Sequence, residues 1–174
     1  MLQLIQSFLP TEVLSLRMGG PIAIVKSPII NPNNLHIDGW WVIDNKSGKQ
    51  LVLLTKDIRE IIDRGLIVND HEVLSQAKDL IRLKDLLKIN FQLTGNKVQS
   101  VSKQNYGKVL DFAFDSTSFY IQKVYSGQPL LKSLSGNNLS IDRSQIIEIT
   151  PTKLIIDDPT VKSKDHEPAL APAN

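Results

Sequence analysis

An internal repeat is the feature of this sequence that most limits how the chain can fold. Residues 55–70 (TKDIREIIDRGLIVND) align without a gap with residues 143–158 (RSQIIEITPTKLIIDD), and six of the sixteen positions are identical. In each segment two apolar runs flank a turn triplet, Asp63–Gly65 in the first and Pro151–Lys153 in the second. Proline presets its own φ and glycine permits positive φ, so both triplets are typical of turns. The repeat therefore predicts the same β-hairpin twice.

Two weaker correspondences keep the same order along the chain. Residues 31–37 (NPNNLHI) resemble residues 115–121 (DSTSFYI), because each is a polar turn followed by residues of high strand propensity. Residues 18–22 (MGGPI) resemble residues 94–98 (TGNKV), because each is a glycine turn that leads into a strand. Duplication of one unit explains a conserved order with drifting loop lengths. We therefore expect a first unit at residues 1–79 and a second unit at residues 80–158.

Most of the remaining segments are short and rich in strand-forming residues, as in residues 22–25, 40–43, 51–54 and 119–124. Strands at intervals of about 8–12 residues are typical of small barrels or sandwiches. A closed barrel also removes the exposed strand edges that invite aggregation. A unit of about 70–80 residues is small for an independent core, so the two units should share buried area. The prediction is a mainly β fold of two tandem small barrels with an interface between them.

The connector between the two units, Asn69–Lys88, is the one helical candidate. Asn69 and Glu72 have the spacing of a helix cap, and apolar residues further on fall near one helical face. A competing interpretation breaks the connector into an extended Leu80–Leu83 and a single helical turn at Lys84–Ile89. The helix and the broken connector both remain open at this point.

The two ends of the chain carry separate expectations. Residues 1–10 (MLQLIQSFLP) are predicted to form a short strand, with a signal peptide as the weaker alternative because a basic start and a cleavage site are missing. Residues 159–174 contain three of the nine prolines and almost no bulky apolar side chain. Such a segment cannot repay the entropy of ordering, so we predict a disordered C-terminal tail.

Charge and cysteine content exclude several classes of protein. Twenty basic and eighteen acidic residues give a formal net charge of +2, and there is no cysteine. Disulfide frameworks, thiolate metal sites and cysteine nucleophiles are therefore ruled out, and a reducing, cytoplasmic location is the expectation. The charge is too small for strong nucleic-acid binding. No stretch approaches the 20 or so apolar residues of a membrane-spanning helix, so no transmembrane segment is expected.

The second unit carries motifs that suggest a family. It reads LTGNKV at residues 93–98, YGKVLDF at residues 106–112 and FYIQKV at residues 119–124, and it closes with the hairpin of residues 144–156. This series resembles the PRC-barrel domain: a glycine-led first strand, a G-K-V-x-D second strand, a third strand after an acidic turn and a final hairpin. The first unit resembles the pattern less closely, because Ser27–Ile30 stands where the G-K-V-x-D strand is expected.

The resemblance implies a fold and a kind of role rather than a reaction. PRC-barrels occur in the cytoplasmic domain of the photosynthetic reaction-centre H subunit, in the C-terminal half of a ribosome maturation factor and in stand-alone bacterial proteins. In the first two the domain serves as an interaction or assembly surface. This chain looks most like the stand-alone tandem proteins. Fold does not fix function, so the partner stays open.

Residue patterns that would carry catalysis or metal binding are weak. His36, His71 and His166 are too far apart in the sequence for a typical zinc site. The carboxylate pairs Asp57/Glu60, Asp142/Glu148 and Asp157/Asp158 are expected as solvated or cross-strand residues rather than an acid–base pair. No serine lies in a G-x-S-x-G elbow, and no glycine motif fits a P-loop or a dinucleotide site. We predict no enzyme activity, no cofactor and no metal.

Two apolar pairs are candidates for partner binding. Neighbours on a strand point to opposite faces, so one of Trp40 and Trp41 should fill a core. The other should either lie under the interface between the barrels or contact a partner, where exposed tryptophan is enriched. Leu130 and Leu131 fit either a core strand or an apolar loop that awaits a partner.

The second unit also has a slight basic excess that would suit an RNA contact, through Lys97, Lys103, Lys108, Lys123, Lys132 and Arg143. The expected function is a non-enzymatic interaction or adaptor module that binds a protein or ribonucleoprotein, by analogy in ribosome assembly or RNA processing. The alternatives are a small-ligand or enzymatic barrel, which needs perturbed titrating groups in a pocket, and a peripheral membrane or photosystem assembly factor, which needs a basic amphipathic helix. The oligomeric state is left open.

Overall fold

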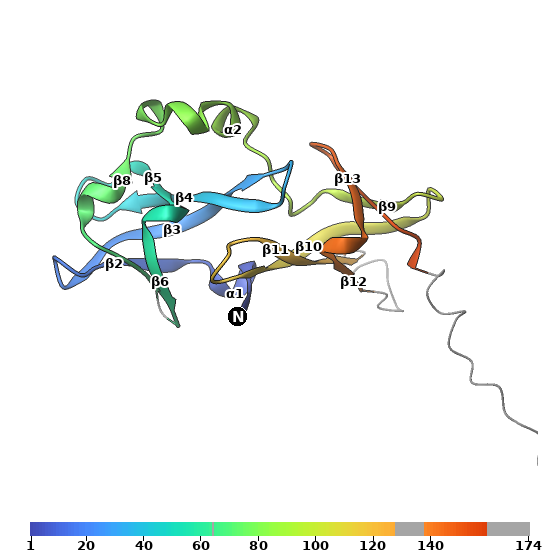
Figure 1. The fold of residues 1–174 in the computed structure, drawn as a ribbon, viewed down its shortest axis with the longest axis horizontal. Helices are drawn as coiled ribbons and strands as arrows, with labels where there is room; N and C mark the ends of the chain where they lie inside the picture. Colours follow the sequence, from blue (N-terminus) through green and yellow to red (C-terminus); the bar gives the residue numbers. More distant parts are fainter. Residues whose placement is uncertain (64, 128–137, 160–174) are drawn as a thin grey trace, which may run out of the picture.

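The computed structural model describes residues 1–63, 65–127 and 138–159, and shows a mainly β protein with two seven-stranded sheets. Figure 1 shows the sheets side by side, with the connector across one side of the first. The residues called a C-terminal tail, apart from Pro159, lie outside the described part of the chain.

The first sheet has the strand order β6-β7-β2-β3-β4-β5-β8. Its neighbouring strands are antiparallel except for the parallel pair β2 and β7. Its strands are β2 (Thr11–Ser15), β3 (Gly20–Asn31), β4 (His36–Asp44), β5 (Gln50–Leu54), β6 (Ile58–Ile62), β7 (Gly65–Val68) and β8 (Leu74–Ser75).

The second sheet has the order β12-β11-β10-β9-β14-β13, and β1 also pairs with β10. Here β9 and β14 form the parallel pair. Its strands are β1 (Leu2–Leu4), β9 (Lys97–Ser100), β10 (Asn105–Asp115), β11 (Ile121–Gly127), β12 (Leu139–Asp142), β13 (Ile146–Ile149) and β14 (Lys153–Ile156).

Six strands of each sheet follow the same order when β2–β7 are matched with β9–β14. The closing hairpins also share a register, because the bulge between Ile58 and Glu60 matches the bulge between Ile146 and Glu148. The 3-10 turns η1 (Thr55–Asp57) and η5 (Arg143–Gln145) lead into these hairpins. In a flat sheet, β5 and β6 would lie about 24 Å apart at about 4.8 Å per strand. Since η1 has only three residues, the first sheet must curl, and η5 imposes the same curl on the second.

Strand pairing corrects two details of the expected repeat. The glycine turns at residues 18–22 and 94–98 are not equivalent, because Gly20 begins β3 whereas Gly95 precedes β9. The strand that matches β9 is β2, since both pair in parallel with the second strand of their hairpin. Residues Ser27–Ile30 lie within β3, which pairs with β4 from Ala23 to Asn31, so a strand is present where the resemblance expects one.

The first residues of the chain cross to the second sheet. The short strand expected over residues 1–10 is present only as β1 at Leu2–Leu4. Residues Ile5–Phe8 form the short helix α1 instead, so the connector is not the only helical part of the described chain. β1 pairs with the end of β10, the Met1 ammonium lies 3.0 Å from an Asp115 carboxylate oxygen, and the Ser116 N–H donates to the Met1 carbonyl. We call residues 1–8 the N-terminal arm. The predicted boundary at residue 79 stays a prediction, but the arm packs on the other side of it.

Of the two interpretations left open for the connector, the broken one is closer, because the connector is not one helix. It consists of η2 (His71–Val73), β8, η3 (Ala77–Asp79), η4 (Ile81–Leu83) and α2 (Lys84–Ile89). The helical turn of the broken alternative is present as α2, but the expected extended Leu80–Leu83 is mostly the 3-10 turn η4. A long helix is prevented because β8 pairs with β5 and Asn90 ends α2 in a left-handed conformation. The N–H of Glu72 is capped by Asp70 rather than by Asn69.

The sheets share one hydrophobic core. Its buried residues come from β2–β5 and β7, from β9–β12 and β14, and from the arm. At its centre, the Phe8 ring lies 5.3 Å from Trp40 and 5.2 Å from Phe114, centroid to centroid. Trp40 belongs to the first sheet and Phe114 to the second, so Phe8 of the arm joins them.

Candidate functional site at the junction of the two sheets

Two hairpin turns meet where the sheets join. The turn between β3 and β4 places Leu35 at a φ of 55°, and the turn between β10 and β11 places Phe119 at a φ of 57°. Non-glycine residues adopt such a φ rarely, so the surrounding bonds must hold it. The Ile37 N–H donates to the Phe119 carbonyl and the Ile121 N–H donates to the Leu35 carbonyl. These two bonds join the turns across the junction.

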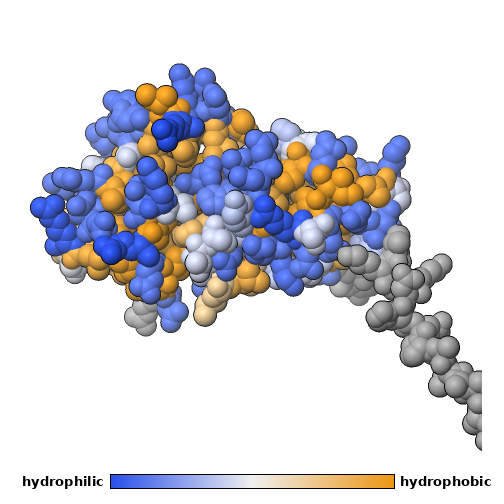
Figure 2. All heavy atoms as spheres, in the orientation of Figure 1, coloured by the Kyte–Doolittle hydropathy of each residue, from blue (hydrophilic) through white to orange (hydrophobic). Residues whose placement is uncertain are grey.

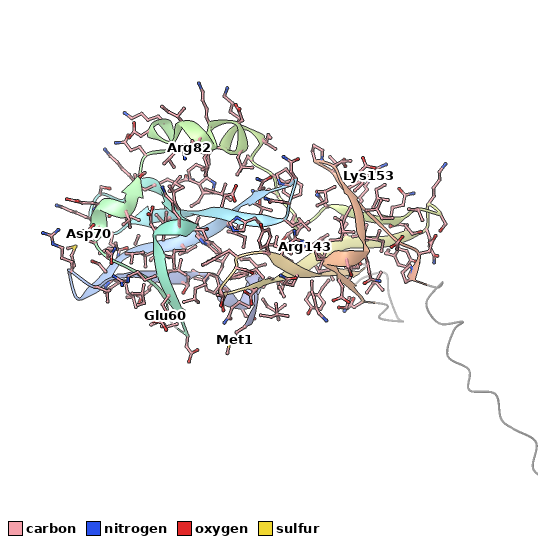
Figure 3. All side chains as sticks on the ribbon, viewed as in Figure 1. Met1, Glu60, Asp70, Arg82, Arg143 and Lys153 are labelled. Carbon is pink, nitrogen blue, oxygen red and sulfur yellow. The ribbon has the colours of Figure 1, made fainter. Side chains whose placement is uncertain are left out.

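Side chains reinforce this link. His36 and Tyr120 face each other across the junction in a β-bridge, with their rings 4.7 Å apart. The guanidinium of Arg143 lies 4.4 Å from the centre of the Tyr120 ring and donates to the Asn34 carbonyl at 2.7 Å. Figure 3 shows Arg143 between the two sheets. Arg143, which we predicted as an RNA contact, is therefore engaged within the molecule.

A cleft of about 780 Å³ opens beside this link. Four parts of the chain line it: the start of β4, residues 54–58 around η1, the connector and the β10–β11 turn. Its apolar wall consists of Leu54, Ile58, Leu80, Ile81, Leu83 and Phe119. The Ile81 side chain is 84% exposed, and Figure 2 shows apolar atoms at the surface of the connector. The cleft therefore offers apolar surface that the fold leaves in contact with water.

The polar edge of the cleft is a histidine–carboxylate pair. His36 Nδ1 lies 2.5 Å from Asp38 Oδ1, and the Asn31 amide donates to Asp38 Oδ2. The carboxylate orients the imidazole, as in many catalytic sites. Among the described residues, no hydroxyl is hydrogen-bonded to His36, and the nearby Ser118 hydroxyl donates to Asp115. The pair is suited to binding a ligand polar group.

The two tryptophans have different surroundings. Trp40 is completely buried in the shared core. It therefore has no exposed surface with which to contact a partner, and that expectation is wrong for Trp40. Trp41 is half-buried beside Leu86 and Leu87 of α2. The prediction that one tryptophan fills a core is met by Trp40, which is also the one at the interface between the sheets. Leu130, Leu131 and Lys132 lie outside the described residues.

The other predicted RNA contacts that the structure describes have three different surroundings. Lys123 forms an ion pair with Asp142 at 3.5 Å between nitrogen and oxygen. Lys103 is exposed in the turn between β9 and β10. Lys97 and Lys108 lie directly opposite each other on β9 and β10. Strand pairing therefore brings together two of the predicted lysines and gives another an acidic neighbour.

A second polar cluster was missed by the sequence analysis. Asp44 is buried at the β4–β5 turn, where it accepts hydrogen bonds from Ser47 and from the backbone of Lys46 and Ser47, and lies 2.7 Å from His71 Nε2. Burial alone would raise the pKa of Asp44, but the hydrogen bonds from Ser47, His71 and the backbone outweigh it and hold the pKa well below its usual value. The cluster fastens η2 to the turn. The segment DNKSG signals such a turn, but the distant His71 has no local signal.

The described residues contain no group of three or more histidine, aspartate or glutamate side chains placed to hold a metal ion. Within the described ranges, no helix has the length and apolar character needed to cross a bilayer.

Comparison with known proteins does not assign this chain to a family. No protein-family model matches the chain, and a search of curated proteins finds no match. The PRC-barrel resemblance therefore rests on the motifs quoted above. It enters the functional argument as a proposal.

Proposed function

We propose that this chain is a non-enzymatic adaptor of tandem PRC-barrel type that binds a partner protein in the junction cleft. The two curled sheets with matched strand order support the tandem arrangement. In this view each sheet is one barrel-like unit, and the cleft arises only where both units and the connector meet. The cytoplasm is the proposed location, and ribosome assembly or RNA processing is the proposed setting by analogy with the family.

The single observation that carries the proposal is the apolar wall of the cleft with Ile81 at its edge. A large apolar side chain at 84% exposure contributes nothing to folding. Contiguous exposed apolar surface with a polar rim is typical of protein interaction sites. Around this wall lie charges of both signs, Lys56 and Arg82 beside Asp38 and Asp79. The expected partner is a protein segment that inserts an apolar side chain and presents polar groups to this rim.

A small molecule is the second candidate occupant. The cleft volume lies within the range of small-molecule pockets, which is about 300–1,000 Å³. The His36–Asp38 pair would fix the orientation of a ligand polar group. Neither an enzymatic barrel nor a membrane or photosystem assembly factor has a comparable observation in its favour.

Affinity capture with the full chain tests the proposal. The tagged protein is incubated with host lysate, half of it treated with nuclease, and bound proteins are identified by mass spectrometry. Ile81→Asp is the test variant, and Leu16→Asp, which changes a 59% exposed leucine in the turn between β2 and β3, is the control. We expect a nuclease-resistant protein that the wild type and the control capture equally. The test variant should capture it about tenfold less, which corresponds to about 1.4 kcal/mol.

Two results would contradict the adaptor role at this cleft. One is that nothing is enriched above an untagged control. The other is that Ile81→Asp captures the same proteins as the wild type. Ribosomal proteins that disappear after nuclease treatment would show an RNA-dependent association instead. Saturable binding of a small molecule that Ile81→Asp abolishes would favour the second candidate.

A further inference from the structure

Three lysines of the second sheet lie in register on adjacent strands. Lys97 of β9 lies opposite Lys108 of β10 and also opposite Lys153 of β14. Paired residues on neighbouring strands project to the same face of a sheet, and neighbouring strands are about 4.8 Å apart. All three residues are exposed. We call Lys108, Lys97 and Lys153 the lysine row.

The lysine row forms no ion pair among the described residues. The ion pairs of the described part of the chain involve other cations, namely the N-terminus, Arg17, His36, His71 and Lys123. The strand pairing places the exposed Glu148 opposite Ile155, two residues along β14 from Lys153, and the ion pairs do not include it. Like charges directly opposite each other destabilise paired strands. The lysine row therefore opposes folding unless an anion neutralises it.

The first sheet shows that the fold does not need basic residues at these positions. There Glu12 of β2 lies opposite Ile24 of β3 and opposite Gly65 of β7. Strands β3, β2 and β7 have the same places in the first sheet as β10, β9 and β14 in the second. The same three-strand row is thus built without a single lysine. A structural role does not explain the three lysines.

We propose that the lysine row binds the phosphate backbone of single-stranded RNA. A line of ammonium groups fits a linear series of phosphates, and lysine attracts phosphate as a point charge without demanding one geometry. Stable binding to a lipid surface takes a second signal besides charge, such as the apolar face of an amphipathic helix, and the lysine row lies on strands. Lys103, at the end of the β9–β10 hairpin, can add a fourth contact.

The RNA site is separate from the junction cleft. The lysine row belongs to β9, β10 and β14, whereas the cleft is lined from β4, η1, the connector and the β10–β11 turn. Figure 3 shows Lys153 over the second sheet, well apart from Arg82 on the connector. The inference therefore does not rest on the proposed protein partner, and either can fail alone.

Fluorescence anisotropy of a labelled oligouridine tests the proposal with the full chain. Three neutralised phosphates predict that log K falls with log salt concentration with a slope of about −2, at about −0.7 per contact for a single strand. The test variant is Lys97→Gln/Lys108→Gln/Lys153→Gln. The control is Lys26→Gln/Lys46→Gln/Lys49→Gln, which removes the same charge from exposed lysines of the first sheet. Circular dichroism confirms that both variants fold.

The lysine-row variant should lose at least about tenfold in affinity at low salt and nearly all of the salt slope. The control variant should keep both. The proposal is overturned if the wild type does not bind the oligouridine at low salt, or if the two variants weaken binding equally. It is also overturned if vesicles with anionic lipid bind the lysine row and RNA does not.

Discussion

Replacing Phe8 with alanine tests whether the N-terminal arm holds the two sheets together. The ring lies about equally far from Trp40 of the first sheet and Phe114 of the second. Only 9% of Phe8 is exposed. Ile5 is the other buried residue of the arm, and the Trp40 and Phe114 rings also lie 5.6 Å apart, so the substitution leaves a cavity beside a contact that remains.

The expected loss follows from the buried surface. A buried phenylalanine removes about 200 Å² from water, which at about 25 cal/mol per Å² gives about 5 kcal/mol as an upper value. Alanine retains part of that area, and the end of a chain can close part of a cavity. Measured Phe→Ala substitutions in cores cost about 3–5 kcal/mol. We therefore expect a decrease of about 3 kcal/mol in the free energy of unfolding, a large share of the about 5–15 kcal/mol that stabilises a typical protein.

Urea unfolding, followed by tryptophan fluorescence and by circular dichroism, measures this loss. Phe8→Leu should cost less than about 1.5 kcal/mol because it keeps most of the volume. Leu2→Ala, at a residue that is 48% exposed, should change stability by less than about 0.5 kcal/mol. A loss below about 1 kcal/mol for Phe8→Ala would refute the reasoning, because the Phe8 ring would then be dispensable for the shared core.

Three further predictions test other contacts. Asp44→Asn should lower the free energy of unfolding by about 2 kcal/mol at pH 7, because the carboxylate accepts several hydrogen bonds. The pKa of Asp44 is lower in the folded than in the unfolded state, so this stabilisation is present above about pH 4 and is lost as the pH falls; urea midpoints of wild type and variant should converge in acid. Arg143→Ala should cost about 1–2 kcal/mol in thermal unfolding through the lost contacts with Tyr120 and Asn34, and Arg143→Lys should recover little of it. Ile81→Asp should leave the urea midpoint unchanged, because the side chain is already in water.

The local parts of the fold could be predicted from the sequence. The hairpins at residues 55–70 and 143–158 could be predicted because strand-forming residues and turn residues alternate within each segment. The turns at residues 31–37 and 115–121 could be matched for the same reason, and the two turns do share a left-handed residue at the same place, Leu35 and Phe119. In both cases the signal lies within a few residues, where propensity acts directly.

The parts of the fold that depend on pairing between distant segments could not be predicted from the sequence. The arm has a strand-forming sequence, but nothing in it shows that its partner is the end of β10. The connector has a helical apolar pattern, yet part of it pairs with β5 as β8. Glycine turns are common, which is why the pattern at residues 18–22 was matched with the wrong strand. In each case the outcome is decided by tertiary contacts, which local propensity does not encode.

The candidate sites also combine features with a local sequence signal and features that depend on pairing between distant segments. Lys97 and Lys108 were identified from the charge of the second unit, but Lys153 joins them only through the parallel pairing of β14 with β9. His36 was correctly expected to be equivalent in position to Tyr120. That the two residues contact each other could not be foreseen, because an alignment of two segments does not show how they pack.

Matched strand order lets one sheet serve as the structural reference for the other. Where the sheets carry the same residue type at a matched position, the fold is the simplest explanation, as for Glu60 and Glu148 beside the bulge of each hairpin. Where they differ, the fold does not require either residue. Arg59 donates to Asn69 within the first hairpin, whereas its counterpart Ile147 is 55% exposed. Glu12 and Lys97 differ in the same way at the centre of their rows. At both positions the second sheet exposes a side chain without a contact among the described residues that would explain it, an isoleucine in one case and a lysine in the other. The search for a macromolecular partner should therefore begin on the second sheet as well as at the cleft.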